Sequence, residues 1–142
     1  MLLLYVVVAT LFALCSATDV THSFRESVIN DDRVWLVEFY SEMCGSCKEF
    51  APTWDMIEQS LPNMSCGKVN IDTPEGMKIA QELNVLEEGI PIIKLFYDAK
   101  VKPGKSIIVE GQTHSSIVSK VRKSVSHNSK RDDGKFVKIL DA

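Results

Sequence analysis

Two cysteines separated by two residues, Cys44 and Cys47, are the residues of this sequence best suited to chemistry. They follow the run VWLVEFY, residues 34–40, whose continuous apolar and aromatic character is typical of a strand buried on both faces. A helix is predicted from 44 to 61, so Cys44 stands at its N-terminus. The free backbone N–H groups and the helix dipole there stabilise a thiolate, which makes Cys44 a nucleophile.

The second cysteine lies one helical turn further, on the same side of the predicted helix as the first. Cys47 can therefore attack a mixed disulfide formed at Cys44 and release the bound partner. A structural disulfide is the main alternative, but a bridge across two residues closes too small a loop to remove much chain entropy. Zinc would need a second ligand pair, which the single Cys66 and the scattered histidines do not supply. The pattern favours a working dithiol that needs no metal and no bound cofactor.

Strands and helices alternate around this pair. Periodicity and breaker residues predict four strands and four helices; the strands are 34–40, 66–72, 90–98 and 106–111, and the helices are 23–32, 44–61, 73–83 and 113–125. Pro52 falls inside the second helix and should kink it. This order predicts an α/β fold in which a parallel core is closed by an antiparallel hairpin, so the central sheet is mixed.

The first seventeen residues carry no charged side chain. Their length and composition predict a signal peptide over 1–17, with an uncleaved signal anchor as the alternative. Cleavage after Ala17 would leave only residues 18–21 for a first strand, so we expect that edge strand to be truncated. It would also leave an odd number of cysteines. We expect Cys66 to be a small buried hydrophobe, with a third redox or intermolecular cysteine as the alternative.

Composition narrows the class of protein and its partners. A chain of 142 residues with net charge -3 fits one globular domain, expected over 18–126, followed by a flexible polar tail over 127–142. The mildly acidic balance argues against nucleic acid as a partner. Membrane contact is expected only if the N-terminal segment stays uncleaved. The C-terminal ILDA is not a retention signal of the KDEL type, so secretion is the alternative to the lumen of the endoplasmic reticulum.

The stretch VWLVEFYSEMCGSCKEFAPTW resembles the active-site segment of the thioredoxin superfamily, and is most similar to the catalytic domains of protein disulfide isomerases. The similarity covers about residues 20–125 and depends jointly on the cysteine pair, VEFY, Pro52 and the Ile-Pro at 90–91. It implies a thioredoxin fold and disulfide exchange with cysteine-containing proteins of the secretory pathway, in which Cys44 attacks and Cys47 resolves. The alternative from another class is a non-catalytic chaperone or adaptor that holds peptides.

The resemblance also implies roles for residues around the pair. Glu38 matches a buried carboxylate; burial should raise its pKa and let it exchange protons with Cys47 through water. Lys68 matches a lysine near that carboxylate, so a structural ion pair is the alternative. Pro91 matches a cis-proline beside the active site, where the backbone of Ile90 would hold an extended substrate peptide. An ordinary trans-proline at the start of a strand is the other possibility.

Several positions depart from the family pattern. Met43 stands where the family usually has tryptophan, and we expect it to contact substrate as a flexible apolar side chain. Ser46 stands where isomerases usually have histidine, so the resemblance does not fix the redox potential of the dithiol. Gln112 stands in a segment where isomerases often carry an arginine. Glu87 and Glu88 add negative charge that should oppose the thiolate and favour basic substrates, unless they are ordinary solvated loop residues.

Overall fold

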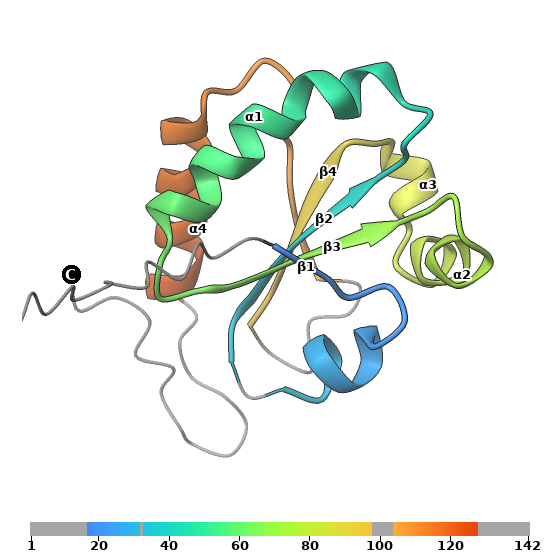
Figure 1. The fold of residues 1–142 in the computed structure, drawn as a ribbon. Coiled ribbons are helices and arrows are strands. Elements are labelled where there is room, and N and C mark those ends of the chain that lie inside the picture. Colours follow the sequence, from blue (N-terminus) through green and yellow to red (C-terminus); the bar gives the residue numbers. More distant parts are fainter. Residues whose placement is uncertain (1–16, 32, 98–103, 128–142) are drawn as a thin grey trace, which may run out of the picture.

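The structure, a computed structural model, describes residues 17–31, 33–97 and 104–127. Helices and strands alternate along the chain (Figure 1). Their bounds are β1 Thr18–Asp19, the π-helix η1 Arg25–Ile29, β2 Trp35–Tyr40, α1 Gly45–Ser60, β3 Ser65–Asn70, α2 Pro74–Glu82, α3 Val85–Glu88, β4 Ile92–Phe96, β5 Lys105–Ile107 and α4 His114–His127. Within these described ranges, no helix has the length and apolar character needed to cross a membrane.

One five-stranded sheet organises the chain, in the order β1-β3-β2-β4-β5. β3 runs parallel to both β1 and β2, whereas β4 is antiparallel to β2, and β5 is antiparallel to β4. The predicted mixed sheet with a parallel core and a closing hairpin is therefore confirmed. β2 has strands on both sides and residues 35–39 are buried, which accounts for the continuous hydrophobicity of its sequence.

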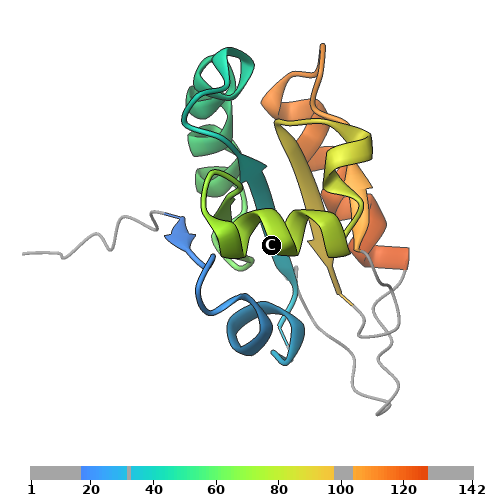
Figure 2. The same cartoon turned by 90° about the vertical axis from the view of Figure 1, so that its right-hand side faces the viewer.

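The sheet separates two sets of helices (Figure 1 and Figure 2). α1 and α4 pack on one face, around a core that includes Leu36 and Trp54; η1 and α2 pack on the other face, around a core that includes Val37 and Phe39. Neighbouring strand residues point to opposite faces, so Glu38 lies on the face of Leu36, beneath α1. The alternation along β2 thus places a carboxylate under the helix that begins at the cysteine pair.

Local chemistry fixes where the helices begin. Thr73 is the N-cap of α2, and its Oγ1 accepts a hydrogen bond from the Gly76 backbone N–H at 3.0 Å, while Pro74 takes the first helical position. Gly76 is required here, because a Cβ at this position would lie 1.8 Å from the Asn70 carbonyl oxygen. α1 runs unbroken from Gly45 to Ser60, although Pro52 lies inside it.

The sequence prediction was wrong about the segment after α2. This segment was expected to be a loop, but Val85–Glu88 forms the short helix α3. Asn84 has a φ of 57°, a left-handed conformation that asparagine adopts more readily than most residues, and it turns the chain from α2 into α3. Val85 is fully buried in the core, so tertiary packing holds this single turn in place.

Strand lengths also differ from prediction at the edges of the sheet. β1 has only two residues, in agreement with the expected truncation of the first strand. β4 begins at Ile92, later than predicted, because Pro91 has no N–H to donate to a strand ladder. The predicted signal segment lies outside the described residues except for Ala17, and so do residues 128–142 of the predicted tail.

Candidate active site

The two cysteines of the pair have different environments. Cys44 is the half-buried N-cap of α1, and its Sγ accepts a hydrogen bond from the Cys47 backbone N–H at 3.2 Å. The Oγ of Ser46 lies 3.2 Å from the same sulfur. Cys47 sits in the first turn of α1 and is only 4% exposed. One sulfur is therefore open to a partner and hydrogen-bonded, while the other is shielded behind it.

This asymmetry sets the protonation of the pair. Burial by itself would raise the pKa of Cys44, but hydrogen bonds from Cys47 and Ser46 outweigh burial and hold that pKa below its ordinary value. Burial, together with the neighbouring Cys44, raises the pKa of Cys47 to about 12. Near neutral pH, Cys44 is therefore the better nucleophile, and Cys47 must lose a proton before its sulfur can attack.

A carboxylate lies beneath the pair, on β2. Glu38 is 2% exposed, and burial raises its pKa to about 7 although the positive charge of Lys68 lowers it. Lys68 is the register partner of Glu38 on β3, and its Nζ lies 3.4 Å from Oε2. That contact is long, and Oε2 is left without a hydrogen-bond partner among the described residues. A group with a pKa near 7 can both accept and release a proton at neutral pH.

Sequence reasoning missed a second buried acid, Glu58 on α1. It is 6% exposed, and its Oε1 has no hydrogen-bond partner in the described structure. Burial raises the pKa of Glu58, and its charge in turn raises the pKa of Glu38. A signal was present in the sequence, because position 58 falls on the apolar stripe formed by Trp54 and Leu61. Two carboxylates therefore lie between α1 and the sheet, and the positive charge of Lys68 acts on both.

A groove lies between the first turns of α1 and the start of β4. The Ile90–Pro91 peptide bond is cis, and both residues line this groove, which has a volume of about 560 Å³. Ser46 also lines it, so the groove begins beside the sulfur of Cys44. Met43 precedes Cys44 and is 88% exposed, on a loop outside the groove wall. Ile90 and Pro91 thus line the same groove as Ser46, whose hydroxyl lies beside the Cys44 sulfur, whereas Met43 is exposed and is not part of the groove lining.

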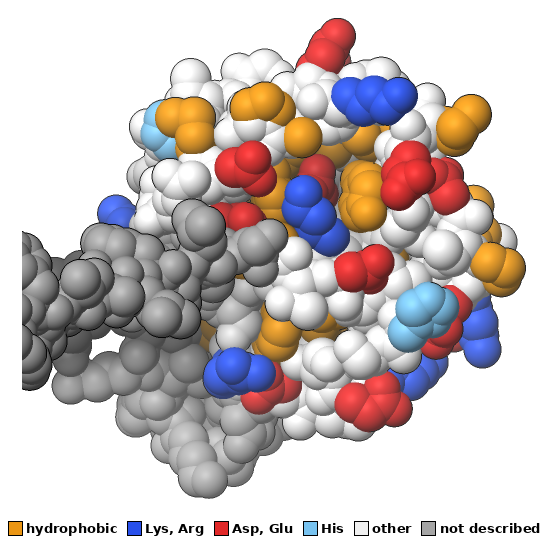
Figure 3. Space-filling model, in the orientation of Figure 1, with side chains coloured by type: hydrophobic (Ala, Val, Ile, Leu, Met, Phe, Trp, Pro, Cys, Tyr) orange, Lys and Arg blue, Asp and Glu red, His pale blue; other side chains and the backbone are white. Residues whose placement is uncertain are grey.

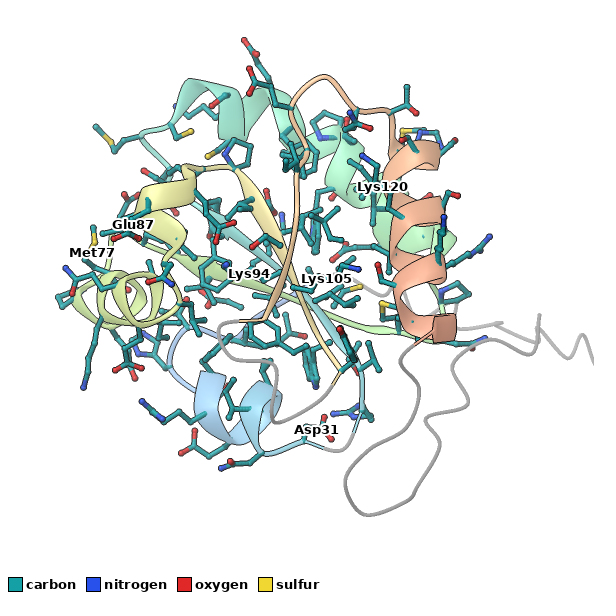
Figure 4. The ribbon with its side chains drawn as sticks, turned by 180° about the vertical axis from the view of Figure 1, so that it is seen from behind. Asp31, Met77, Glu87, Lys94, Lys105 and Lys120 are labelled. Carbon is teal, nitrogen blue, oxygen red and sulfur yellow. The ribbon has the colours of Figure 1, made fainter. Side chains whose placement is uncertain are left out.

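The expectation for Glu88 was wrong, because a buried lysine neutralises it. Lys94 on β4 is fully buried; its Nζ lies 2.6 Å from Glu88 Oε1 and 2.8 Å from the Oγ of Ser106 on β5. Figure 4 shows Lys94 on β4, between α3, where Glu87 is labelled, and β5. A buried ammonium group requires such partners. Lys94 was visible in the sequence as the one charge in the apolar run IPIIKLF.

The remaining candidates for chemistry do not join this site. Cys66 on β3 is buried in the core beneath α1 and α4, in agreement with a packing role. Among the described residues, no group of three or more histidine, cysteine, aspartate or glutamate side chains could hold a metal ion. The chemistry available at this site is thus sulfur exchange at Cys44 and Cys47, with Glu38 as the nearby acid.

Comparison with known proteins places the chain in a family. A family model described as Thioredoxin matches residues 16–123. Protein disulfide-isomerase A6 from Homo sapiens is 31% identical over 112 residues, which are 75% of this chain and 24% of that protein. The protein disulfide-isomerase A6 homolog from Drosophila melanogaster is 36% identical over 101 residues, which are 68% of this chain and 22% of that protein. The chain thus spans about a quarter of the length of these relatives.

Solved structures agree with that assignment. Oxidised thioredoxin from Plasmodium falciparum is 26% identical, with a TM-score of 0.56 over 77% of this chain and 98% of that one. The first thioredoxin domain of mouse protein disulfide-isomerase A4 is 29% identical, with a TM-score of 0.51 over 67% of this chain and 65% of that one. The family match and the five-stranded sheet with its flanking helices show that this chain belongs to the thioredoxin family and has the thioredoxin fold.

Proposed function

We propose that this chain is a thiol–disulfide oxidoreductase of the protein disulfide isomerase type, which acts on cysteine-containing proteins. The observation that carries the proposal is the asymmetric pair at the start of α1, in which Cys44 is hydrogen-bonded at the N-cap and Cys47 is buried behind it. The names of the human and fly relatives, both protein disulfide-isomerases, support it.

The first step joins the substrate to Cys44. The Cys44 thiolate attacks one sulfur of a substrate disulfide; a bond forms between these two sulfurs, and the substrate disulfide breaks. The departing substrate thiolate takes a proton from water. The substrate chain lies extended against the backbone of Ile90, in the groove beside the cis-proline Pro91.

The second step releases the substrate. Glu38 accepts the proton of Cys47 through water, and the Cys47 sulfur attacks the Cys44 sulfur. The Cys44–Cys47 disulfide forms, the mixed disulfide breaks, and the second substrate thiolate leaves and is protonated. Two electrons pass from the dithiol to the substrate; the reverse sequence oxidises a substrate, and both directions on one substrate isomerise it. The dithiol is the redox centre, so the proposal includes no bound cofactor.

The place of action that we propose is the secretory pathway, with the lumen of the endoplasmic reticulum as first choice. The support is the uncharged segment 1–17, which has the character of a signal peptide. Fractionation of cells that express the tagged full chain, followed by protease protection, tests this proposal. A tagged protein that remains digestible in sealed vesicle preparations would contradict it.

Turnover in a disulfide reduction assay tests the activity. We expect Cys44→Ser to abolish turnover, and Cys47→Ser to accumulate mixed disulfides with substrate because release is blocked. Cys66→Ala is the matched control, since it removes a thiol that lies in the core away from the pair. If the parent protein turns over substrate no faster than Cys44→Ser, the proposal is wrong, and peptide binding without catalysis becomes the better account of the groove.

A further inference from the structure

The groove beside the dithiol carries charged groups of one sign. Its floor includes the apolar side chains of Phe50, Ile90 and Pro91, and its walls include Glu49 on α1 and Glu110 after β5. No described residue forms an ion pair with either of these two glutamates. The third acid of the lining, Glu88, is neutralised by Lys94 as described above, and no lysine, arginine or histidine is among the lining residues.

This charge is local to the groove. Acidic and basic side chains are interspersed over the face of the molecule shown in Figure 3. A different groove, between β5 and α4, is lined by Lys105 on β5 and by Lys120 and Lys123 on α4; the first two are labelled in Figure 4. The net charge of the chain is only -3, so the acidity of the groove reflects the placement of Glu49 and Glu110 rather than the overall composition.

The acidic groove adjoins the reactive cysteine through Ser46. Ser46 lines the groove and its Oγ is 3.2 Å from the Cys44 sulfur. A peptide whose sulfur is joined to Cys44 therefore places its adjacent residues along the groove. The carboxylates of Glu49 and Glu110 are acceptors for ammonium or guanidinium groups, and the apolar floor can contact the methylene stems of the same side chains.

We propose that this groove selects cysteinyl peptides that carry lysine or arginine next to the cysteine. The inference rests on the proposed function, because it names the substrate class of that same dithiol. Wall carboxylates of one sign raise the local concentration of basic peptides and speed their encounter with the thiolate. They also disfavour peptides with acidic residues beside the cysteine, because like charges repel at short range.

Two matched peptides test the selection. Each contains one cysteine joined to thionitrobenzoate by a disulfide, flanked by lysines in one peptide and by glutamates in the other. Release of the coloured thiol gives the rate with the reduced protein, and division by the rate with dithiothreitol removes the difference in intrinsic reactivity. We expect the normalised rate to favour the lysine peptide by about tenfold at low salt, and the preference to shrink as salt screens the charges.

The glutamates are then replaced together. In the Glu49→Gln and Glu110→Gln double variant we expect the normalised preference to fall toward one, whereas Glu26→Gln should keep it. Glu26 is the matched control because it is an exposed glutamate on η1, at the other end of the sheet from the cysteine pair (Figure 1). A circular dichroism spectrum of each variant checks the fold, and its rate with iodoacetamide checks the reactivity of Cys44.

The outcomes separate the two proposals. Equal normalised rates for the two peptides with the parent protein, or an undiminished preference in the double variant, overturn the selection while leaving disulfide exchange intact. If neither peptide reacts faster with the parent protein than with Cys44→Ser, the proposed function fails, and the selection fails with it.

Discussion

Replacement of Glu38 by glutamine should make the protein more stable at alkaline pH and leave its stability unchanged in acid. Glu38 is 2% exposed, and burial raises its pKa from an ordinary 4.5 to about 7. A shift of this size corresponds to about 3 kcal/mol of free energy that opposes ionisation in the folded state. Glutamine has nearly the same shape and cannot ionise, so Glu38→Gln removes this cost.

The sign follows from proton binding in the two states. Between pH 4.5 and about 7, the folded protein holds the proton on Glu38 while the unfolded chain has released it. The contribution of Glu38 to stability is therefore greatest below this window, and it falls as the pH rises through it. The variant lacks this fall, so its advantage over the parent should grow to about 3 kcal/mol above the window.

Urea unfolding of both proteins in the reduced state, at about pH 4 and about pH 8.5, measures the effect. Glu26→Gln is the control for the same substitution at an exposed glutamate. The reasoning is refuted if the stability advantage of Glu38→Gln over the parent changes by less than about 1 kcal/mol between the two pH values. It is also refuted if this advantage decreases as the pH rises. Glu58→Gln should lower the upper end of this pH window, because it removes a like charge that raises the pKa of Glu38 in the folded protein.

Three further predictions concern the same region. Alkylation of Cys44 against pH, with the second cysteine replaced by serine, should give a midpoint below the roughly 8.5 of free cysteine, and a midpoint at or above that value counts against an activated thiol. Ser46→His should raise the reduction potential by about 30 mV for each 1.4 kcal/mol by which histidine stabilises the reduced form; an unchanged or lower potential in glutathione buffers contradicts this. Glu88→Ala should destabilise the fold by about 3 kcal/mol because it leaves Lys94 buried without its carboxylate. Glu87→Ala should cost less than about 0.5 kcal/mol, and equal losses in urea unfolding would show that the ion pair contributes nothing.

The sequence by itself determined the order of the main strands and helices, with α3 missed, and the place of the dithiol. A continuous apolar run predicted β2 and apolar periodicity predicted α1, because the pattern of buried side chains is a property of each segment alone. The short connection between β4 and β5 predicted their antiparallel hairpin. The start of the predicted helix 73–83 agrees with α2, whose Thr73 cap acts through a bond to a residue nearby in the chain. The position of Cys44 at the start of α1 followed from the same local signals.

Only the tertiary structure decided which charges meet. Lys94 lies six residues from Glu88 in the sequence, but they pair because α3 folds back over β4. Glu58 acts on Glu38 because α1 packs on the face of the sheet to which the β2 carboxylate points. The walls of the acidic groove come from α1, the segment before β4 and the segment after β5. Desolvation and charge pairing depend on distances between segments remote in the chain, and these distances exist only after the sheet and helices have packed.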